Sequence, residues 1–505
     1  MNRVGNQERA TLGHMWLRSR FHLPVPPPYT ESYVVAGARR TEVIGHSTVE
    51  FYPRAYATGD DIVANLRFAL RYEPLDLGVL AAAFAAMPAE IVADWVRREP
   101  SGSYARRAWF LYEYLTGTML DLPDASAGNY VEALDPRKHV TAARRNSSRH
   151  RVADNLLGTP GLCPTVRRTS RLAAQIDVHI DAEARAIIER HDPAVLARAV
   201  RYLFTKETRS SFAIEGETPT PDRTERFVAA LRSAPTFDAT DKGAIVGLQN
   251  MIVDPRYAAT DWRTFQNFVG ETTVDFREEV HFICPRPEDV SSLMDGWMAT
   301  TARMLDGGVE PVVAAAVAAF AFVFIHPFED GNGRIHRFVV HHVLSRTGFS
   351  PDDLIFPVSA AIVRDQRRYD AVLERFSQPL FAAIDWAWTS EREITVRNDT
   401  APLYRYFDAT PFVEYLYDRV VDTVRTDLHE QLGFLTIFDQ AMEGVRAIVD
   451  MPDRRAALLI RLMLQNGGRL SLTKRKQFPE LTDDELGAME AVVQAAMAEG
   501  AAKQN

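Results

Sequence analysis

The longest unbroken apolar stretch of the chain runs from Val312 to Ile325 and ends abruptly at a polar cluster, "HPFEDGNGRIHR". A stretch without a polar face predicts a helix that is buried on all sides. It is shorter than the roughly 20 residues that a membrane-spanning helix needs. Pro327 prevents simple continuation of this helix, so the pattern predicts that it delivers His326 at its C-terminal end.

Helical patterning also covers most of the remaining chain. It dominates from about Asp60 to Leu122, returns near Asp181 and continues through residues 220–380. In "HDPAVLARAVRYLFTKETRSSFAIEGE" the first aspartate, Asp192, is placed to cap a helix, with a proline at the first helical position. Gly216 is placed to stop that helix, which predicts a helix of several turns ahead of the central part of the chain.

Extended structure is predicted in fewer places. The alternation from Val274 to Cys284 predicts a hairpin or flap, and "GNYVEALDPRKHV" and "NLLGTPGLCPTVRRT" contain turn residues with short β-like pieces. The first ~30 residues end in "LPVPPPYTES", where consecutive prolines exclude helix and favour extended backbone. We therefore expect an irregular arm at the N-terminus.

These patterns divide the chain into four parts. We expect an irregular arm (1–34), an N-terminal domain whose role the sequence does not declare (35–170), a central helical domain with a helix near 193–216 (171–395) and a helical C-terminal region (396–505).

The last ~60 residues permit two interpretations. Their order is helix, Gly-Gly turn, basic helix start, loop with a proline and helix, which is compatible with a winged-helix or helix-turn-helix module and with DNA contact. The alternative is a plain helical bundle in which Lys474, Arg475 and Lys476 form a solvated face. Both stay open on the sequence alone.

Composition narrows the functional class. With 46% hydrophobic and 25% charged residues, the chain is not disordered over most of its length. Its formal charge of -9 excludes a molecule built as a polycation for nucleic acid or membrane. Two distant cysteines, Cys163 and Cys284, give neither a disulfide scaffold nor a structural zinc site. The N-terminus shows no signal peptide, so a cytoplasmic protein is expected, with no membrane partner.

The polar cluster after the apolar helix combines the parts of a phosphate-handling site. A helix that starts near Gly333 presents free N–H groups and the positive end of its dipole, which suits an anion. Arg334 and Arg337 share one helix face and match phosphate oxygens. Asp330 has the wrong charge for phosphate unless Mg²⁺ lies between them. His326 can accept a proton near neutral pH. The alternative, a surface ion-pair network around a glycine turn, is disfavoured by the fixed order of the whole set.

The segment "HPFEDGNGRIHR" resembles the signature of the Fic (filamentation induced by cAMP) family, His-Pro-Phe-x-Asp/Glu-Gly-Asn-Gly-Arg-x-x-Arg, at every defined position. The resemblance extends over roughly 190–390. It implies a mainly α fold: a helical Fic-type core with a small β-hairpin flap, an N-terminal helical domain and a C-terminal winged-helix-like module. It also implies transfer of AMP from ATP to a Ser, Thr or Tyr hydroxyl of a protein, with Mg²⁺ on the phosphates.

The resemblance assigns roles to individual residues. His326 would deprotonate the hydroxyl, Asp330 would hold Mg²⁺, and the stretch "FREEVHF" (276–282) falls where the family flap pairs with the target segment. The nucleotide would be bound by Gly331, Asn332 and Gly333 around the phosphates, Arg334 on the β-phosphate, Arg337 on the γ-phosphate and Tyr369 near the adenine. The family often has a Tyr-Tyr pair and a later Asn there, whereas this chain has Arg368 before Tyr369 and Phe376 or Ser377 near the Asn position, so the choice of base stays open.

A second segment, "SSFAIEGE", matches the family's inhibitory motif, Ser/Thr-x-x-x-Glu-Gly/Asn, through Ser211, Glu215 and Gly216. Ser211 and Glu215 are four residues apart, so a helix would place them on one face. Glu215 paired with Arg337 would occupy the γ-phosphate position and repel the anion. An exposed ion pair gives only about 0–1 kcal/mol, so this pair must be substantially buried to act as a brake.

Other chemistry-bearing residues have ordinary interpretations. His336, His341 and His342 lack a carboxylate or cysteine at ligand spacing and are expected to be structural or surface residues. Cys284 is expected to be a small hydrophobe, since no feature lowers its pKa.

Several functions therefore stay in competition with AMP transfer. They are removal of AMP with Glu215 positioning a water, phosphorylation of the Doc type, against which the intact Gly333 argues, and a nucleotide-sensing regulator that binds DNA. Self-modification and homo-oligomer formation are compatible with the resemblance and also stay open.

Overall fold

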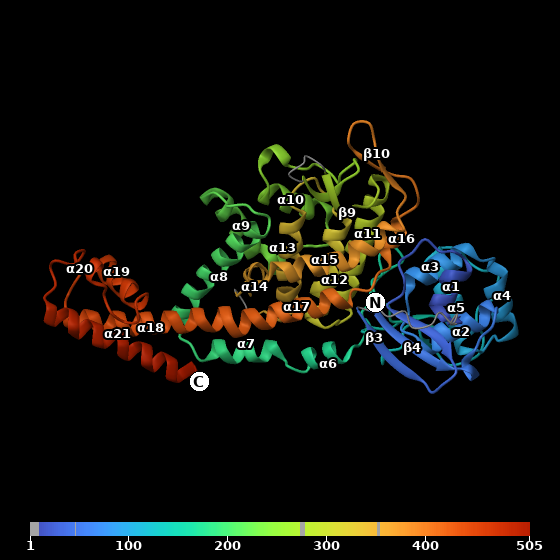
Figure 1. The fold of residues 1–505 in the computed structure, drawn as a ribbon, viewed down its shortest axis with the longest axis horizontal. Helices are drawn as coiled ribbons and strands as arrows, with labels where there is room; N and C mark the ends of the chain where they lie inside the picture. The colour runs from blue at the N-terminus through green and yellow to red at the C-terminus, as the bar shows by residue number, and fades with distance from the viewer. Residues whose placement is uncertain (1–9, 46, 273–277, 351–353, 505) are drawn as a thin grey trace, which may run out of the picture. The chain divides into compact units, whose positions relative to one another are not determined.

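The computed structural model describes residues 10–45, 47–272, 278–350 and 354–504. Helices dominate it, which confirms the prediction of a mainly α protein (Figure 1). The chain forms two compact units. Unit 1 comprises Met1–Val178, Ser211–Phe349 and Ile362–Asp418, and unit 2 comprises His179–Ser210, Ser350–Ala361 and Arg419–Asn505.

The N-terminal part of unit 1 mixes helices with two small sheets. Its elements are β1 (Thr11–Leu12), α1 (Gly13–Arg20), β2 (Thr30–Val35), β3 (Arg40–Ile44), β4 (Ser47–Pro53), η1 (Arg54–Tyr56), α2 (Ile62–Tyr72), α3 (Leu77–Ala86), α4 (Ala89–Arg98), α5 (Ser103–Thr116), β5 (Val131–Glu132), β6 (Arg145–Ser147), β7 (Val152–Asp154) and α6 (Ser170–Ile176). The first sheet has the order β1-β2-β4-β3, with β2 and β4 parallel and the other pairs antiparallel. The second has the order β5-β7-β6.

Two expectations for this region need correction. The described part of the predicted arm is not irregular, because Leu12 and Leu17 are buried and His14 bonds Glu73 through Nδ1 at 2.7 Å. The prolines lie in the loop between α1 and β2. The N-terminal domain is also not purely helical. Strand β5 lies in one of the predicted β-like pieces. The other strands were missed because they are short, and because β3 is exposed along its whole length and shows no alternation.

The rest of unit 1 is built around an apolar helix. Its elements are α9 (Pro221–Ser233), η2 (Ala234–Thr236), α10 (Lys242–Ile252), η3 (Pro255–Tyr257), β8 (Phe268–Thr272), β9 (Glu278–Ile283), α11 (Pro287–Asp306), α12 (Pro311–Ile325), α13 (Asn332–Arg346), α15 (Gln366–Phe381), β10 (Trp386–Trp388), β11 (Ile394–Val396), α16 (Ala401–Arg405) and α17 (Thr410–Asp422), whose last residues belong to unit 2.

The apolar helix α12 is buried almost throughout, as its sequence predicts. Glu310 caps it by accepting a hydrogen bond from the backbone N–H of Val313 at 2.8 Å. The indole N–H of Trp297 on α11 donates to the carbonyl of Ala318 at 2.7 Å, and α13 packs along the other side. The helix is therefore held on several sides at once, which fixes the position of its C-terminal end.

The predicted hairpin is also present. Strands β8 and β9 pair antiparallel from Phe268 opposite Ile283 to Thr272 opposite Glu278, with a register shift between Val269 and Gly270. The prediction of a hairpin is confirmed for these strands, whereas residues 273–277 of the predicted flap lie outside the described residues.

Unit 2 consists of helices over its described residues. Its elements are α7 (Ile180–Glu189), most of α8 (Pro193–Ile214), the start of α14 (Val358–Arg364), the π-helix η4 (Thr423–Leu428), α18 (His429–Ile448), α19 (Asp453–Leu464), α20 (Leu472–Arg475) and α21 (Asp483–Gln504). The signals that bound α8 are confirmed. Asp192 accepts from the backbone N–H of Ala194 at 2.7 Å, and Gly216 follows the helix with φ +71°.

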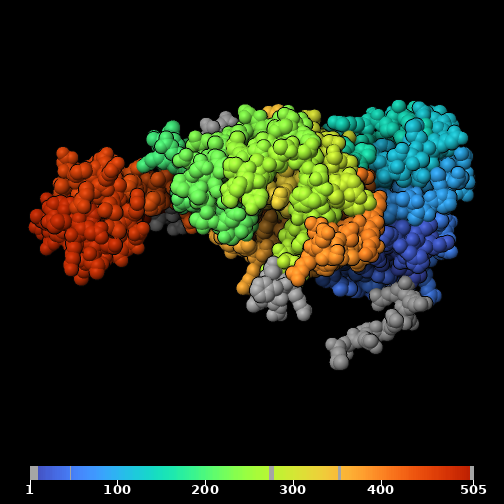
Figure 2. All heavy atoms as spheres, turned by 90° about the horizontal axis from the view of Figure 1, so that it is seen from above, coloured from blue at the N-terminus to red at the C-terminus, as the bar shows by residue number. Residues whose placement is uncertain are grey.

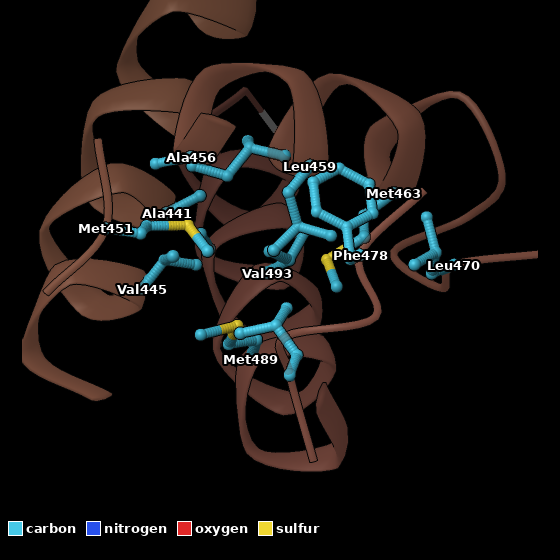
Figure 3. Close-up of a cluster of buried hydrophobic side chains, with 13 residues drawn as sticks. Ala441, Val445, Met451, Ala456, Leu459, Met463, Leu470, Phe478, Met489 and Val493 are labelled. Atoms are coloured by element: carbon cyan, nitrogen blue, oxygen red, sulfur yellow. The ribbon is translucent and has the colours of Figure 1, made fainter. Parts of the chain in front are cut away.

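The C-terminal helices share one apolar core. Figure 3 shows side chains from α18, α19, the loop around Leu470, Phe478 and α21 pointing toward one another. Phe478, between α20 and α21, is fully buried in this cluster.

The described residues of this region form a bundle of helices without a wing. Among the described residues beyond 396 there is no strand, so the wing that a winged-helix module requires is absent from them, and α20 has only four residues. Arg475 donates to the carbonyls of Phe478 and Leu481 and pairs with Asp483, so its guanidinium closes a loop instead of joining a solvated basic face. Lys474 and Lys476 are exposed as expected.

Within the described residues no single helix is both long and apolar enough to cross a membrane, and only the sharply bent pair α3 and α4 reaches the threshold when taken together.

Candidate active site

The C-terminal end of α12 places His326 in an unusual backbone conformation. His326 has φ +53° and ψ +59°, a left-handed geometry that is uncommon for residues other than glycine. Its Nδ1 lies 3.2 Å from the carbonyl oxygen of Val323, which can only accept, so Nδ1 carries the proton and Nε2 keeps its lone pair. Burial lowers the pKa of His326 to about 4. The imidazole is therefore neutral at pH 7 and suited to act as a base.

Arg263 holds this turn in place. Its Nε donates to the carbonyl of His326 at 2.8 Å, and its backbone N–H donates to the carbonyl of Pro327 at 2.8 Å. Its terminal nitrogens donate at 2.7 Å each to the carbonyls of Phe265 and Pro285, which flank the β8–β9 hairpin. Arg263 is buried, and its charge helps to lower the pKa of His326. No spacing or motif connects Arg263 with the polar cluster, so no sequence pattern indicated this residue.

The loop after His326 is fixed by its own side chains. Both amide atoms of Asn332 bond the backbone of Phe328, with Nδ2 donating at 2.8 Å and Oδ1 accepting at 3.0 Å. Both polar atoms of the Asn332 side chain are thus used within the turn, so Asn332 can bind a phosphate only through its backbone N–H. Gly331 has φ +91°, and a Cβ there would lie 2.8 Å from Val253. Gln249 is a further residue that the sequence did not indicate, because its Nε2 donates to the carbonyl of Asp330 at 3.2 Å.

Glu215 bridges the two arginines of α13. Its Oε1 accepts from Arg337 Nη2 at 2.7 Å, and its Oε2 lies 3.0 Å from Arg334 Nε. Only the first contact is an aligned hydrogen bond, because Arg334 Nε has no acceptor in hydrogen-bond geometry. Ser211 adds two acceptors for Arg337, with its hydroxyl at 2.7 Å and its carbonyl at 2.8 Å. The predicted inhibitory residues and Arg337 therefore meet.

The burial of this cluster is uneven. The side chains of Arg334 and Arg337 are 0% and 3% exposed, whereas that of Glu215 is 26% exposed. A buried arginine needs an anionic partner or several acceptors, and Glu215 supplies the first from a position that water reaches. The carboxylate is therefore the part of the cluster that can leave most easily.

Gly333 makes room for Glu215. A Cβ at this position would lie 2.5 Å from Glu215 Oε1 and 3.2 Å from Arg337 Nη1. The glycine is thus required where the carboxylate approaches the start of α13, in addition to any contact with a phosphate.

A cleft of about 740 Å³ brings most of the predicted residues together. Its lining includes the predicted residues Glu215, His326, Asp330, Gly331, Asn332, Gly333, Arg337 and Tyr369. Arg334 does not line it, because its side chain lies behind the loop, bonded to the carbonyl of Ile252 at 3.2 Å and to Asp330 at 2.6 Å. Ser211 and Gly216 are likewise outside the lining.

The far end of the cleft is formed by α15 and the hairpin. Tyr369 is buried, which raises its pKa to about 12, so it is a neutral phenol. Ser377 lines the cleft, whereas Phe376 stacks on Phe324 with ring centroids 4.0 Å apart and does not line it. Residues 268–271 and His281 of the hairpin form the opposite edge.

Asp330 fits the part of a Mg²⁺ ligand. Its Oδ1 accepts from the N–H of Gly331 and from Arg334, both at 2.6 Å, while its side chain is 38% exposed at the cleft. One carboxylate with an accessible oxygen beside an anion nest is the usual protein contribution to Mg²⁺ carried on phosphates.

The remaining candidates have structural contacts. His336 and His342 are buried and place Nδ1 at 2.7 Å and 2.8 Å from the carbonyls of Ala319 and Ala234. Cys284 is buried, and burial raises the pKa of its thiol to about 12, so it packs as a small hydrophobe.

Comparison with known proteins agrees with this site. Residues 239–344 match the sequence profile of the Fic/DOC family. The protein adenylyltransferase Fic of Nematostella vectensis is 25% identical over 202 residues, 35% of this chain and 43% of that protein. The protein adenylyltransferase Fic of Culex quinquefasciatus is 42% identical over 72 residues, 14% of each chain. This chain thus spans less than half the length of these curated relatives.

A solved structure is also similar. A Fic family protein from Desulfovibrio desulfuricans G20 is 22% identical and covers 63% of this chain and 86% of that one, with a TM-score of 0.38, a value too low to support an argument.

Proposed function

Because residues 239–344 match the profile of the Fic/DOC family, we propose that the chain is an autoinhibited protein adenylyltransferase. It transfers AMP from ATP to a Ser, Thr or Tyr hydroxyl of a protein. One observation carries this proposal: a single cleft contains a neutral His326, a glycine-lined helix start and Arg337, and Glu215 occupies the arginine. The base, the anion-binding helix start and the phosphate-binding arginine therefore lie in one cleft, and the carboxylate of Glu215 occupies the position that we expect a substrate phosphate to take.

The chemistry follows from these positions. Nε2 of His326 accepts the proton of the target hydroxyl, and the hydroxyl oxygen attacks the α-phosphorus in line. The bond from the α-phosphorus to the bridging oxygen breaks, and pyrophosphate leaves with the electron pair. Backbone N–H groups at Asn332 and Gly333 bind phosphate oxygens, and Arg337 binds the terminal phosphate once Glu215 has left. Mg²⁺ held by Asp330 would neutralise charge on the phosphates.

Arg334 acts differently from the expectation. It is bonded to Asp330 and stands behind the loop with Phe212 under its guanidinium, 5.1 Å from the ring centroid. We propose that it orients Asp330 and reaches the β-phosphate only after Glu215 has moved.

The energetic requirement for autoinhibition is modest. A competent population near 1% corresponds to about 2.7 kcal/mol, since each tenfold change is about 1.4 kcal/mol. An exposed ion pair gives less than this, but Arg337 is almost fully buried and makes three contacts with Ser211 and Glu215. The buried arginine supports a brake of the required size.

The proposal is tested by mass measurement. Glu215→Gly protein is incubated with ATP, Mg²⁺ and a lysate, and proteins that gain the mass of AMP are identified. We expect self-modification or target modification about 100-fold above the unaltered chain, which follows from a competent population near 1%. His326→Ala in the same background serves as control and should abolish the adduct while nucleotide binding remains measurable. An adduct that survives in this control would remove His326 as the base.

The same measurement separates the competing functions. A phosphate adduct would support phosphorylation. Loss of AMP from a modified target that occurs with the unaltered chain and not with Glu215→Gly would support Glu215 as the residue that positions water, which its 26% exposed side chain permits. No adduct from Glu215→Gly would favour a nucleotide sensor, for which salt-dependent binding of DNA is the second readout.

The proposed setting is the cytoplasm, supported by the fact that both cysteines, Cys163 and Cys284, are buried free thiols. The proposed partner is a protein with an accessible hydroxyl. Self-modification and homo-oligomer formation remain compatible with it.

A further inference from the structure

A second cavity of about 390 Å³ lies within unit 1, separate from the candidate active site. Its walls come from the proline-containing loop 25–29, the start of α3, the helix α15 and residues 402–408, with Ser47 at one side. Its size is within the range of small-molecule sites, which commonly lie where two parts of a structure meet.

The walls are firmly joined. Thr165 donates its N–H to the carbonyl of Phe407 at 2.9 Å, and Ala409 donates back to the carbonyl of Thr165 at 2.8 Å. A Cβ at Gly78 would lie 2.9 Å from the carbonyl oxygen of Tyr406, so α3 approaches this segment as closely as a glycine allows. Figure 2 shows the blue and cyan atoms of the N-terminal part directly against the yellow and orange atoms of the central part. The walls of the cavity are therefore held together by direct contacts within unit 1.

The guanidinium of Arg375 lines this cavity without a partner of opposite charge among the described residues. It makes no ion pair with any residue that the structure describes, and its buried Nε has no hydrogen-bond acceptor. One turn later on α15, Pro379 lacks the N–H that would bond the carbonyl of Arg375, and it also lines the cavity. A buried donor without an acceptor costs free energy, so the site favours an anionic group that supplies one.

Asp76 presents the opposite charge. Its Oδ1 caps α3 by accepting from the N–H of Val79 at 2.9 Å, and no described cationic side chain lies within ion-pair distance. The other aspartate of the cavity, Asp408, differs because Arg167 pairs with it at 2.5 Å. Burial raises the pKa of Asp76, and the nearby His14, which makes no ion pair with it, partly opposes this rise. Asp76 is therefore the carboxylate that a cationic group would satisfy.

Tyr29 links the two charges. Both Arg375 and Asp76 act electrostatically on its phenol, and no described residue hydrogen-bonds its hydroxyl. The rest of the lining is mainly apolar and comes from prolines and from side chains such as Leu380, Leu403 and Phe407. An anion subsite and a cation subsite thus share one apolar chamber.

We propose that this cavity binds a small zwitterion with an apolar body, of which a free apolar α-amino acid is the simplest example. Its carboxylate bonds Arg375 and the hydroxyl of Tyr29, its ammonium bonds Asp76, and its side chain packs on Leu380 and Leu403. A ligand that carries only an anionic group leaves the charge of Asp76 without a partner. A ligand that carries only a cationic group leaves the charge of Arg375 without a partner.

The position of the cavity connects it with the candidate active site. Glu374 lines both cavities, and the opposite face of α15 carries Tyr369 and Ser377. A ligand in the second cavity therefore contacts the helix that forms the far end of the first.

The test measures binding and does not depend on AMP transfer. Calorimetric titrations of the His326→Ala protein, without nucleotide, use L-phenylalanine, L-leucine, L-phenylalaninamide and 3-phenylpropionate. We expect at least one of the two amino acids to bind with a dissociation constant of millimolar or below. The amide lacks the carboxylate and the propionate lacks the ammonium, so each should bind at least tenfold more weakly than phenylalanine.

Matched variants locate the site. Arg375→Met should weaken amino-acid binding at least tenfold, and so should Asp76→Asn, which keeps a capping side chain for α3. Arg368→Met is the control on the same helix, because Arg368 pairs with Asp418 and does not line the cavity. The proposal is overturned if neither amino acid binds, if the two analogues bind as tightly as phenylalanine, or if Arg375→Met binds like the control.

Discussion

Two buried arginine arrangements lie on either side of the loop that follows α12, and they differ in what they bind. Among the described residues, the side chain of Arg263 is bound only by carbonyl oxygens of the backbone, among them that of His326 at 2.8 Å and that of Pro285 at 2.7 Å. Arg337 is bound by Ser211 and by the carboxylate of Glu215 at 2.7 Å. The first arrangement has no anion, and the second has one.

The difference separates a fixed contact from an exchangeable one. Backbone carbonyls at the end of α12 and beside the hairpin cannot move away from Arg263 without unfolding those elements. The carboxylate of Glu215 stands at the end of α8, followed by Gly216, and its side chain is partly exposed. A polyphosphate can therefore replace Glu215 at Arg337, whereas no ligand replaces the carbonyls at Arg263. Under the proposed function, Arg263 builds the site and Arg337 controls access to it.

The largest effect should come from the fixed contact. Arg263→Met in the Glu215→Gly background removes four side-chain hydrogen bonds and frees the turn at His326. We expect the rate of AMP transfer at saturating ATP to fall about 100-fold, the cost of a small misplacement of a catalytic group, with little change in the KM for ATP.

NMR titration of His326 distinguishes a purely structural role of Arg263 from a role in setting the pKa and position of His326. Because the charge of Arg263 contributes to the low pKa of the imidazole, the pKa should rise toward its ordinary value in Arg263→Met. A folded variant with an unchanged His326 pKa and an unchanged rate would show that the turn holds without this arginine.

The next effect concerns pH. The folded pKa of His326, about 4, lies below its ordinary value, so the neutral base persists in acid. In Glu215→Gly the transfer rate should stay level from pH 7 down to about pH 5 and then fall about tenfold per unit below pH 4. In Arg263→Met this decline should begin at a higher pH than in Glu215→Gly alone, although burial, the main cause of the low pKa of His326, still keeps it below the ordinary value. Stability changes in the same direction, because the unfolded chain binds the proton more readily between pH 6.5 and 4, and stability is lost as pH falls through that window. A decline centred on pH 6.5 in Glu215→Gly would contradict an imidazole that is kept neutral by its surroundings.

The smallest effect should come from the exchangeable contact. Ser211→Ala in the otherwise unaltered chain removes one hydroxyl acceptor of Arg337, worth about 1 kcal/mol, and should raise self-modification about fivefold. Thr205→Ala is the control, because its hydroxyl bonds only the carbonyl of Arg201 on the same helix. Equal activity of Ser211→Ala and Thr205→Ala would show that the hydroxyl of Ser211 does not help to hold Arg337.

The sequence predicted those parts of the site that depend on neighbouring residues. The uniform apolar stretch of α12, the arrest of that helix at His326 and the stop at Gly216 each follow from local composition. The two short motifs also paired Glu215 with Arg337 correctly. Most strands of the N-terminal part were missed, because strands as short as β6 or as exposed as β3 leave no periodic pattern.

What the sequence determined by itself is the set of reactive groups, since spacing along one helix or one turn fixes which side chains can point together. What only the tertiary structure decided is how each group is used. Asn332 is committed to the backbone of Phe328, and Arg334 lies behind the loop instead of lining the cleft. Arg263 reaches His326 from 63 positions away. Such contacts join residues that no local pattern relates, because burial and hydrogen-bond satisfaction are settled only when distant segments pack against one another.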